Sequence, residues 1–214
     1  MADFIDIFLL GEGEEMNNEL LALLRTAKAE GWSKQDFLEK ASQIGGVYVP
    51  SFYKPVYNDD CTINHFDVHP GAPEKVTKRI IADMNSVHFP LSPIVPSTEV
   101  VHDRVNLELF RGCVRGCRFC QAGHVYRPIR AKSPELLAEQ GKVLLKNTGC
   151  QDITLLSLSS SDYRCLSELC DELLGYCEPR SIGLSLPSLR ADNFSMDIMH
   201  RIQKTRKSGL TFAP

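Results

Sequence analysis

Three cysteines, Cys113, Cys117 and Cys120, lie within eight residues of one another in the spacing Cys-x3-Cys-x2-Cys. Thiolates are soft ligands that suit iron–sulfur clusters or zinc. A cubane iron–sulfur cluster takes four ligands, so three cysteines would leave one iron for another molecule to bind. Gly112 and Gly116 let the loop wrap tightly around a bound group.

A structural zinc site is the main alternative use of these thiols. His124 would complete a Cys3His ligand set with Cys113, Cys117 and Cys120, giving a zinc-stabilised binding module without catalysis. Zinc ribbons and knuckles usually contain two short Cys-x2–4-Cys turns, and this sequence has no second pair. The arginines around the three cysteines argue against unliganded thiols in an apolar core.

The charge of the chain is unevenly distributed. Its 214 residues include 24 Lys and Arg against 27 Asp and Glu, a net charge of −3, which excludes a basic nucleic-acid binder. Residues 111–132 nevertheless contain six basic residues and no acidic one. Such a patch would neutralise an anionic cluster with a carboxylate-bearing cofactor, or contact a phosphate-bearing substrate such as RNA. Pairing of these arginines with distant acidic residues is the simpler alternative.

The sequence predicts a cytoplasmic protein that does not enter a membrane. It lacks the roughly 18 consecutive apolar residues of a membrane-spanning helix. Asp3 and Asp6 stand where a signal peptide requires positive charge. The eight cysteines are therefore expected in a reducing compartment, where clustered thiols favour metal or redox chemistry over disulfides.

From residue 105 onward, apolar runs of strand length alternate with segments of helical length. The expected strands are 105–110, 153–158, 182–186 and 210–213. The expected helices are one from Ser133-Pro134 to Gly149, one capped by Ser161 or Asp162 and ending before Pro179, and one capped by Asp192 or Asn193. This alternation predicts an α/β fold with a parallel sheet, whose chemistry lies in the loops that follow the strands.

The sequence divides into three segments. Within residues 1–31, a short buried strand is expected over 5–10 and a helix ending near Gly31, and residues 105–214 form the α/β region. Residues 32–104 contain seven prolines between positions 50 and 100, which predicts an irregular connector with a short element around 74–84. The last strand has no covering helix, and four parallel strands cannot close a barrel. We therefore expect a fragment truncated after the fourth strand, or a fold that is completed by something absent from this sequence.

The cysteine triad, with Phe119 directly before its last member, resembles the signature of radical S-adenosylmethionine (SAM) enzymes. Further segments resemble successive strand-end segments of one largely uncharacterised family in which a cobalamin-binding-type domain precedes the radical SAM domain. They are residues 107–130, 155–163, 185–190 and 208–214. Residues 3–15 resemble the last strand and turn of the upstream domain, so residues 1–31 would be the remnant of a Rossmann-like domain. This chain is not expected to bind cobalamin by itself.

The resemblance implies a partial (βα) barrel with a [4Fe–4S] cluster at its mouth. Cys113, Cys117 and Cys120 would bind three irons, and SAM would chelate the fourth. An electron from a flavodoxin- or ferredoxin-type donor would then cleave SAM to methionine and a 5′-deoxyadenosyl radical, which removes hydrogen from an unknown substrate. The residues 105–214 would be the N-terminal part of this radical SAM core domain.

The resemblance also implies residues that contact SAM, although no catalytic acid or base is identified. Phe119 would pack near the adenine, or be a core aromatic. Ser160 and Asp162 follow the second strand, where related enzymes use a Gly-Gly-Glu-like segment that this sequence lacks. The alternative for that segment is a helix N-cap. Ser188 or Arg190 would meet the SAM ribose or carboxylate, because a guanidinium binds a carboxylate bidentately. A surface salt bridge would also explain Arg190.

Overall fold

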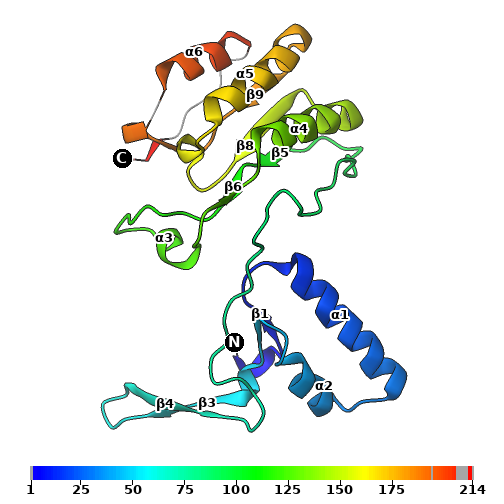
Figure 1. The fold of residues 1–214 in the computed structure, drawn as a ribbon, viewed down its shortest axis with the longest axis vertical. Coiled ribbons are helices and arrows are strands. Elements are labelled where there is room, and N and C mark those ends of the chain that lie inside the picture. Colours follow the sequence, from blue (N-terminus) through cyan, green and yellow to red (C-terminus); the bar gives the residue numbers. More distant parts are fainter. Residues whose placement is uncertain (1, 194, 206–211, 214) are drawn as a thin grey trace. The chain divides into compact units, whose positions relative to one another are not determined.

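The chain folds into two compact units that divide after Ala82 in the computed structural model, which describes residues 2–193, 195–205 and 212–213. Each unit has its own cluster of buried apolar side chains. Figure 1 shows the elements of both units.

The first unit is built from short elements and one long helix. In chain order they are η1 (Ala2–Phe4), β1 (Phe8–Leu9), α1 (Gly13–Glu30), α2 (Lys34–Ala41), β2 (Val47–Tyr48), η2 (Pro50–Phe52), β3 (Tyr53–Tyr57) and β4 (Ile63–Val68). The helix predicted within residues 1–31 is confirmed. The strand predicted over 5–10 is present only as Phe8–Leu9, and it is not buried, because Leu9 is 37% exposed. The helix ends at Gly31, whose φ of 67° is a left-handed value that glycine adopts without strain.

The predicted irregular connector over residues 32–104 is wrong for its first half. This segment supplies α2, β2 and the hairpin β3–β4, and most of the buried core of the first unit comes from it. Pro50 opens a 3₁₀ turn, and Pro55 lies in a two-stranded hairpin, where a missing amide hydrogen is tolerated. The short element expected around 74–84 is neither helix nor strand, and Arg79 there forms an isolated bridge with Gly11.

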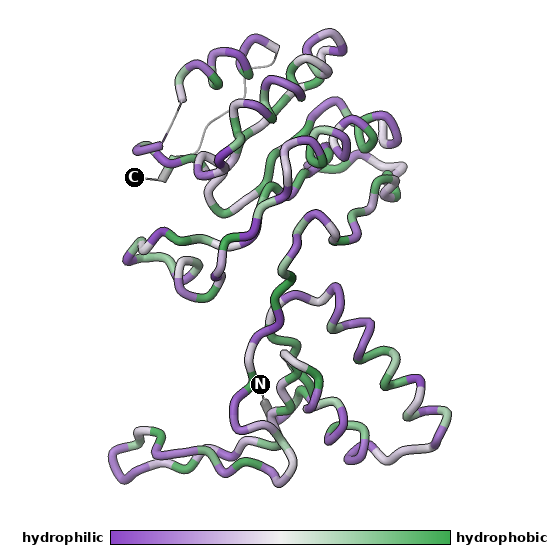
Figure 2. The backbone as a smooth tube through the Cα atoms, viewed as in Figure 1, coloured by the Kyte–Doolittle hydropathy of each residue, from purple (hydrophilic) through white to green (hydrophobic). Residues whose placement is uncertain are grey.

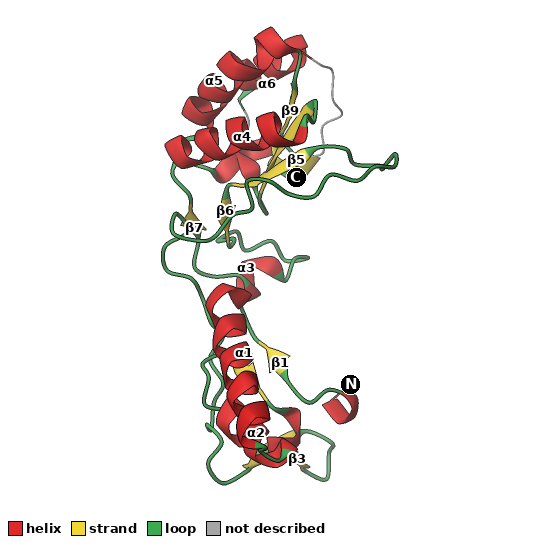
Figure 3. Cartoon of the chain, turned by 90° about the vertical axis from the view of Figure 1, so that its right-hand side faces the viewer, coloured by secondary structure: helices red, strands yellow, loops and turns green. Residues whose placement is uncertain are grey.

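The second unit contains the predicted parallel sheet. β5 (Val105–Glu108), β8 (Asp152–Leu156) and β9 (Gly183–Ser185) are hydrogen-bonded in the order β5-β8-β9, and both pairings are parallel. The connections carry α4 (Pro134–Thr148) and α5 (Leu166–Cys177), and α6 (Met196–Thr205) follows β9 (Figure 3). The α/β class is therefore confirmed, while the radical SAM type of partial barrel stays a prediction.

Helices α4 and α5 pack against one face of this sheet. A Cβ atom on Gly141 of α4 would lie 3.0–3.1 Å from side-chain atoms of Leu107, Ile153 and Leu173, so the two helices and the strands approach closely. Hydrophilic and hydrophobic residues alternate along both helices (Figure 2). The opposite face carries Asn106, Thr154 and Ser185, which are in register across the three strands. This second face of the sheet is therefore polar at its centre, where Thr154 is buried.

The first predicted helix matches α4, but the caps predicted for the other two helices are wrong. Ser133 caps α4 by accepting a hydrogen bond from the Leu136 amide, and Gly149 ends it with a φ of 72°. Helix α5 begins after Cys165 instead of Ser161 or Asp162, and it ends at Cys177, before Pro179. Helix α6 begins after Ser195, whose hydroxyl accepts from the Ile198 amide, instead of Asp192 or Asn193.

Short elements lie between the strands and helices of the second unit. They are β6 (Phe110–Arg111), α3 (Ala122–Val125), β7 (Arg130–Ala131), η3 (Ser160–Asp162), η4 (Glu178–Arg180), β10 (Leu189–Arg190), η5 (Ala191–Asn193) and β11 (Phe212–Ala213). Of the predicted fourth strand, residues 210 and 211 lie outside the described residues. Its end, β11, pairs in parallel with β10.

Candidate cofactor site

The cysteines lie in a loop that follows β5 and is closed by the antiparallel pair β6–β7. We call residues 112–129 the cysteine loop. Because β5, β8 and β9 are parallel, the loops that follow them leave the sheet at the same edge. The cysteine loop, η3 and the segment β10–η5 are these three loops.

Backbone contacts at two glycines fold the cysteine loop. Gly112 has a φ of 101°, and a Cβ there would lie 2.5 Å from the Pro128 carbonyl oxygen. A Cβ on Gly123 would overlap the carbonyl oxygen of Arg115. The Cys113 amide donates to the Tyr126 carbonyl at 2.8 Å. The glycines therefore bring the two limbs of the loop into direct contact.

All eight cysteines are free thiols. Cys113 is buried, and Cys117 and Cys120 are half-buried. Across residues 2–193, 195–205 and 212–213, no three His, Cys, Asp or Glu side chains are grouped closely enough to hold a metal ion. Thiolates suit an iron–sulfur cluster by their donor chemistry. However, the three thiols do not surround a common point in the described part of the chain. His124 and the three cysteines are likewise not grouped as a metal site among the described residues.

Asp162 is the centre of a polar network that reaches the cysteine loop. Its carboxylate accepts two hydrogen bonds from Arg115, at 3.0 Å from Nε and 2.5 Å from Nη2. It also accepts from the Ser159 hydroxyl at 2.8 Å and from the Asn193 amide at 3.1 Å. The Arg115 hydrogen bond is the largest influence holding the pKa of Asp162 well below its usual value, against the opposing effect of burial.

Arg190 links the same network to a cysteine. Its guanidinium donates to both carboxylate oxygens of Asp192 at 2.9 Å, and its Nη1 lies 3.5 Å from Cys117 Sγ. Arg115 Nη1 lies 3.6 Å from the same Asp192 carboxylate. The hydrogen bonds between Arg190 and Asp192 raise the pKa of Arg190 and lower the pKa of Asp192. The charges therefore alternate in the order Asp162, Arg115, Asp192, Arg190.

The structure brings four of the five predicted SAM-contacting residues into neighbouring loops. The Ser160 amide donates to the Ser188 carbonyl at 3.0 Å, and the Arg190 amide donates to Ser161 Oγ at 3.2 Å. Ser160 is fully buried, and its hydroxyl is bonded to the Leu155 carbonyl. The Ser188 hydroxyl is exposed and makes no hydrogen bond to any residue that the structure describes.

Phe119 does not join these residues and is 79% exposed. It is therefore not a core aromatic, which was the alternative to an adenine contact.

Sequence reasoning missed the partners that hold this network together. Arg115 was recognised only as one charge of a basic patch, and Asp192 and Asn193 only as helix caps. Arg115 and Asp162 are separated by 47 residues, so no local pattern identifies the pair. The position of Arg115 between two cysteines was the available signal.

Most of the basic patch is used within the protein. Arg111 pairs with Glu108 at 2.8 Å, and Arg127 donates to the carbonyls of Gly123 and Val114. Lys132 is buried, with its ammonium 4.2 Å from the ring centre of Phe89. These contacts favour internal pairing over an RNA-binding surface.

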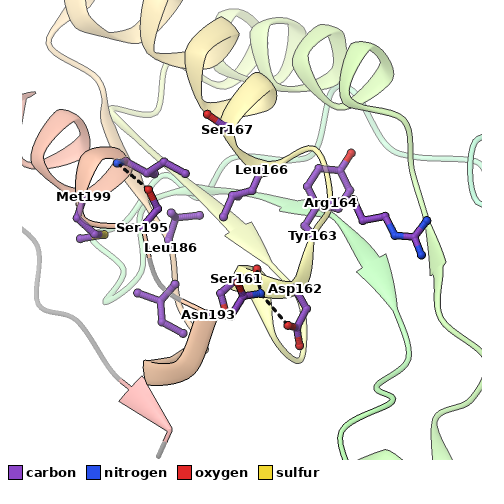
Figure 4. Close-up of a pocket in the computed structure, with 12 residues that line it drawn as sticks. Ser161, Asp162, Tyr163, Arg164, Leu166, Ser167, Leu186, Asn193, Ser195 and Met199 are labelled. Carbon is purple, nitrogen blue, oxygen red and sulfur yellow. Dashed lines mark hydrogen bonds between the residues drawn. The ribbon is translucent and has the colours of Figure 1, made fainter.

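A pocket of about 390 Å³ lies beside the network, between η3, the start of α5 and α6. Asp162 and Asn193 both line it, and Figure 4 shows the hydrogen bond between them. Its other walls are largely apolar, with Leu186, Leu189 and Ile198 among them.

Two comparisons with known proteins bear on the family of this chain. Residues 1–50 match the family described as "Radical SAM proteins, N-terminal", which supports a radical SAM-related family. The match lies in the first unit and does not include the cysteine loop. Among described residues, no helix has both the length and the apolar composition needed to cross a bilayer.

The full chain also aligns with an uncharacterised protein of Methanocaldococcus jannaschii. The two are 28% identical over 218 residues, which is all of this chain and 39% of the relative. The chain therefore spans about two fifths of the length of the curated relative that it matches.

Proposed function

We propose that this chain is part of a radical SAM enzyme in which Cys113, Cys117 and Cys120 hold a [4Fe–4S] cluster and SAM occupies the open iron. The observation that carries the proposal is the convergence of three strand-end loops, in which Arg190 approaches Cys117 and Arg115 binds Asp162. The family match over residues 1–50 supports the same class independently. When bound, the cluster and SAM would supply the 5′-deoxyadenosyl radical chemistry.

The residues around the thiols are suited to an anionic group. Arg115 and Arg190 are cationic at any working pH, and their carboxylate partners raise both pKa values further. Arg190 places one N–H toward Cys117 Sγ, and hydrogen bonds to cluster sulfurs are one means of setting the reduction potential. Cysteine ligands must lose their protons on binding metal, and nearby cations favour the thiolate.

SAM binding in the proposed site would use the free groups of the same loops. The exposed Ser188 hydroxyl and the exposed ring of Phe119 are available for a ribose or adenine contact. In contrast, three nitrogens of Arg190 already face Asp192 and Cys117. Arg190 would therefore have to exchange a partner to bind the SAM carboxylate. A flavodoxin- or ferredoxin-type electron donor, and a substrate that the site does not identify, complete the proposal.

Anaerobic reconstitution with iron and sulfide tests this proposal. The intact chain should take up about four irons and become brown, and the Cys117→Ala variant should lose most of both. Cys61→Ala is the matched control, because Cys61 is an exposed free cysteine in the hairpin turn of the first unit. It should load iron like the parent chain. Zinc retained after purification, with no uptake of iron, would favour the binding module and contradict the enzyme.

A further inference from the structure

We propose that Asp162 is a positioning residue that anchors the cysteine loop to the sheet edge before any cofactor binds. It would act through Arg115, with Asp192 and Arg190 extending the same chain of charges to Cys117. This inference rests on the proposed function, because it concerns the loop that would hold the cluster. It assigns Asp162 a role other than contact with SAM.

The hydrogen bonds of Asp162 support an anchoring role. Its carboxylate has four donors, two on Arg115, one on Ser159 and one on Asn193. An ionised carboxylate offers about four acceptor positions, so none is left for the amino group of SAM. The Asp162 side chain is only 12% exposed, and its contact with Arg115 is bidentate. Both features distinguish this pair from an exposed ion pair of little energetic value.

The cysteine loop has few apolar contacts that could hold it instead. Val114 and Phe119 are 57% and 79% exposed, and Tyr126 is 57% exposed. The hydrogen bonds of Cys113 and Arg127 join residues within the loop. By contrast, Arg115 connects the loop to η3, and Cys117 is connected to β10 through Arg190. Polar contacts therefore fix the loop where hydrophobic burial is small.

Arg115 lies where its movement would displace the segments that carry all three thiols. Arg115 lies between Cys113 and Cys117, and its carbonyl oxygen is in contact with Gly123 on the return limb of the loop. Movement of Arg115 away from Asp162 would displace both limbs. The loss of Asp162 should therefore expose Cys113, which is buried in the anchored loop.

Cysteine alkylation in the metal-free, reduced chain tests this inference without a cluster. The reagent is iodoacetamide, and mass spectrometry gives a separate rate for each cysteine. Asp162→Asn should raise the rate at Cys113 by at least about threefold, because local opening controls access to a buried thiol. Cys61, in the other unit, is the internal reference. An unchanged rate at Cys113 would overturn the inference.

Two further readouts separate anchoring from general loss of structure. Cys170 is fully buried in the core, and burial raises its pKa to about 12, so it should alkylate slowly in both proteins. Equal acceleration at Cys170 and Cys113 would show global loosening and overturn the positioning role. Glu172→Gln, which removes the ion pair with Lys142, is the matched control and should leave Cys113 unchanged.

Exchanging the charges of Arg115 and Asp162 tests whether a re-formed ion pair restores the slow alkylation of Cys113. The double variant Arg115→Asp with Asp162→Arg should bring the Cys113 rate back toward that of the parent, whereas each single variant should not. Iron uptake should follow the same order in reconstitution. If the parent takes up no iron, the proposed function fails, while the alkylation rates still decide whether Asp162 anchors the loop.

Discussion

Asp162 concentrates the polar contacts of the site on one carboxylate, and this has a consequence for stability as pH changes. Hydrogen bonding from Arg115 lowers its pKa in the folded chain, while Ser159 and Asn193 contribute in the same direction. A carboxyl group whose folded pKa is depressed stabilises the fold above its unfolded pKa, about 3.9. That contribution is lost as pH falls below this value toward the folded pKa.

We therefore expect the difference in unfolding free energy between the parent and Asp162→Asn to shrink as pH is lowered from about 6 to about 3. Arg115, Arg190 and Asp192 are the charged neighbours that belong to the same network. Urea unfolding of the metal-free proteins at several pH values measures the difference. A difference that stays constant over this range would mean that the Asp162 carboxylate is not held in its ionised form by the fold.

At the scale of elements, α4 is the helix whose limits were predicted best. Ser133 accepts from the Leu136 amide at 3.3 Å, Pro134 occupies the first turn, and Gly149 closes the helix in a left-handed conformation. These signals are local, so they are visible in the sequence. The helix also contributes Leu137, Leu144 and Leu145 to the core.

The Ser133→Ala variant should lose about 1 kcal/mol of unfolding free energy, because one amide at the helix start loses its acceptor. Ser167→Ala is the comparison, since Ser167 lies exposed in the first turn of α5 and does not act as its cap. It should change the unfolding free energy by much less. Equal losses in urea titrations of the two variants would contradict the capping role of Ser133.

The errors in the predicted caps have a physical cause. Ser161 and Asp162 have the side chains of good N-caps, but Ser161 Oγ accepts from the Arg190 amide and Asp162 binds Arg115. Contacts between segments distant in sequence therefore replaced the local hydrogen bonds that a cap would make. The same contacts explain why the sequence could place Ser160, Asp162, Ser188 and Arg190 after strand ends but could not predict their partners.

In the whole molecule, the family match and the candidate site lie in different units. The family match covers residues 1–50 of the first unit, and the cysteine loop belongs to the second. The parallel sheet was predictable because apolar runs and helical segments alternate regularly from residue 105. The hairpin β3–β4 was not, because its one proline, Pro55, is compatible with a two-stranded sheet and gives no signal for it.

Electron paramagnetic resonance of the intact, reconstituted and reduced chain tests whether the three cysteines hold a cluster with one open iron. We expect the signal of a reduced [4Fe–4S] cluster whose shape changes when SAM is added, because SAM would bind the iron that the three cysteines leave open. The Cys117→Ala variant should lack this response. A cluster signal that is the same with and without SAM, or no cluster signal at all, would contradict the account.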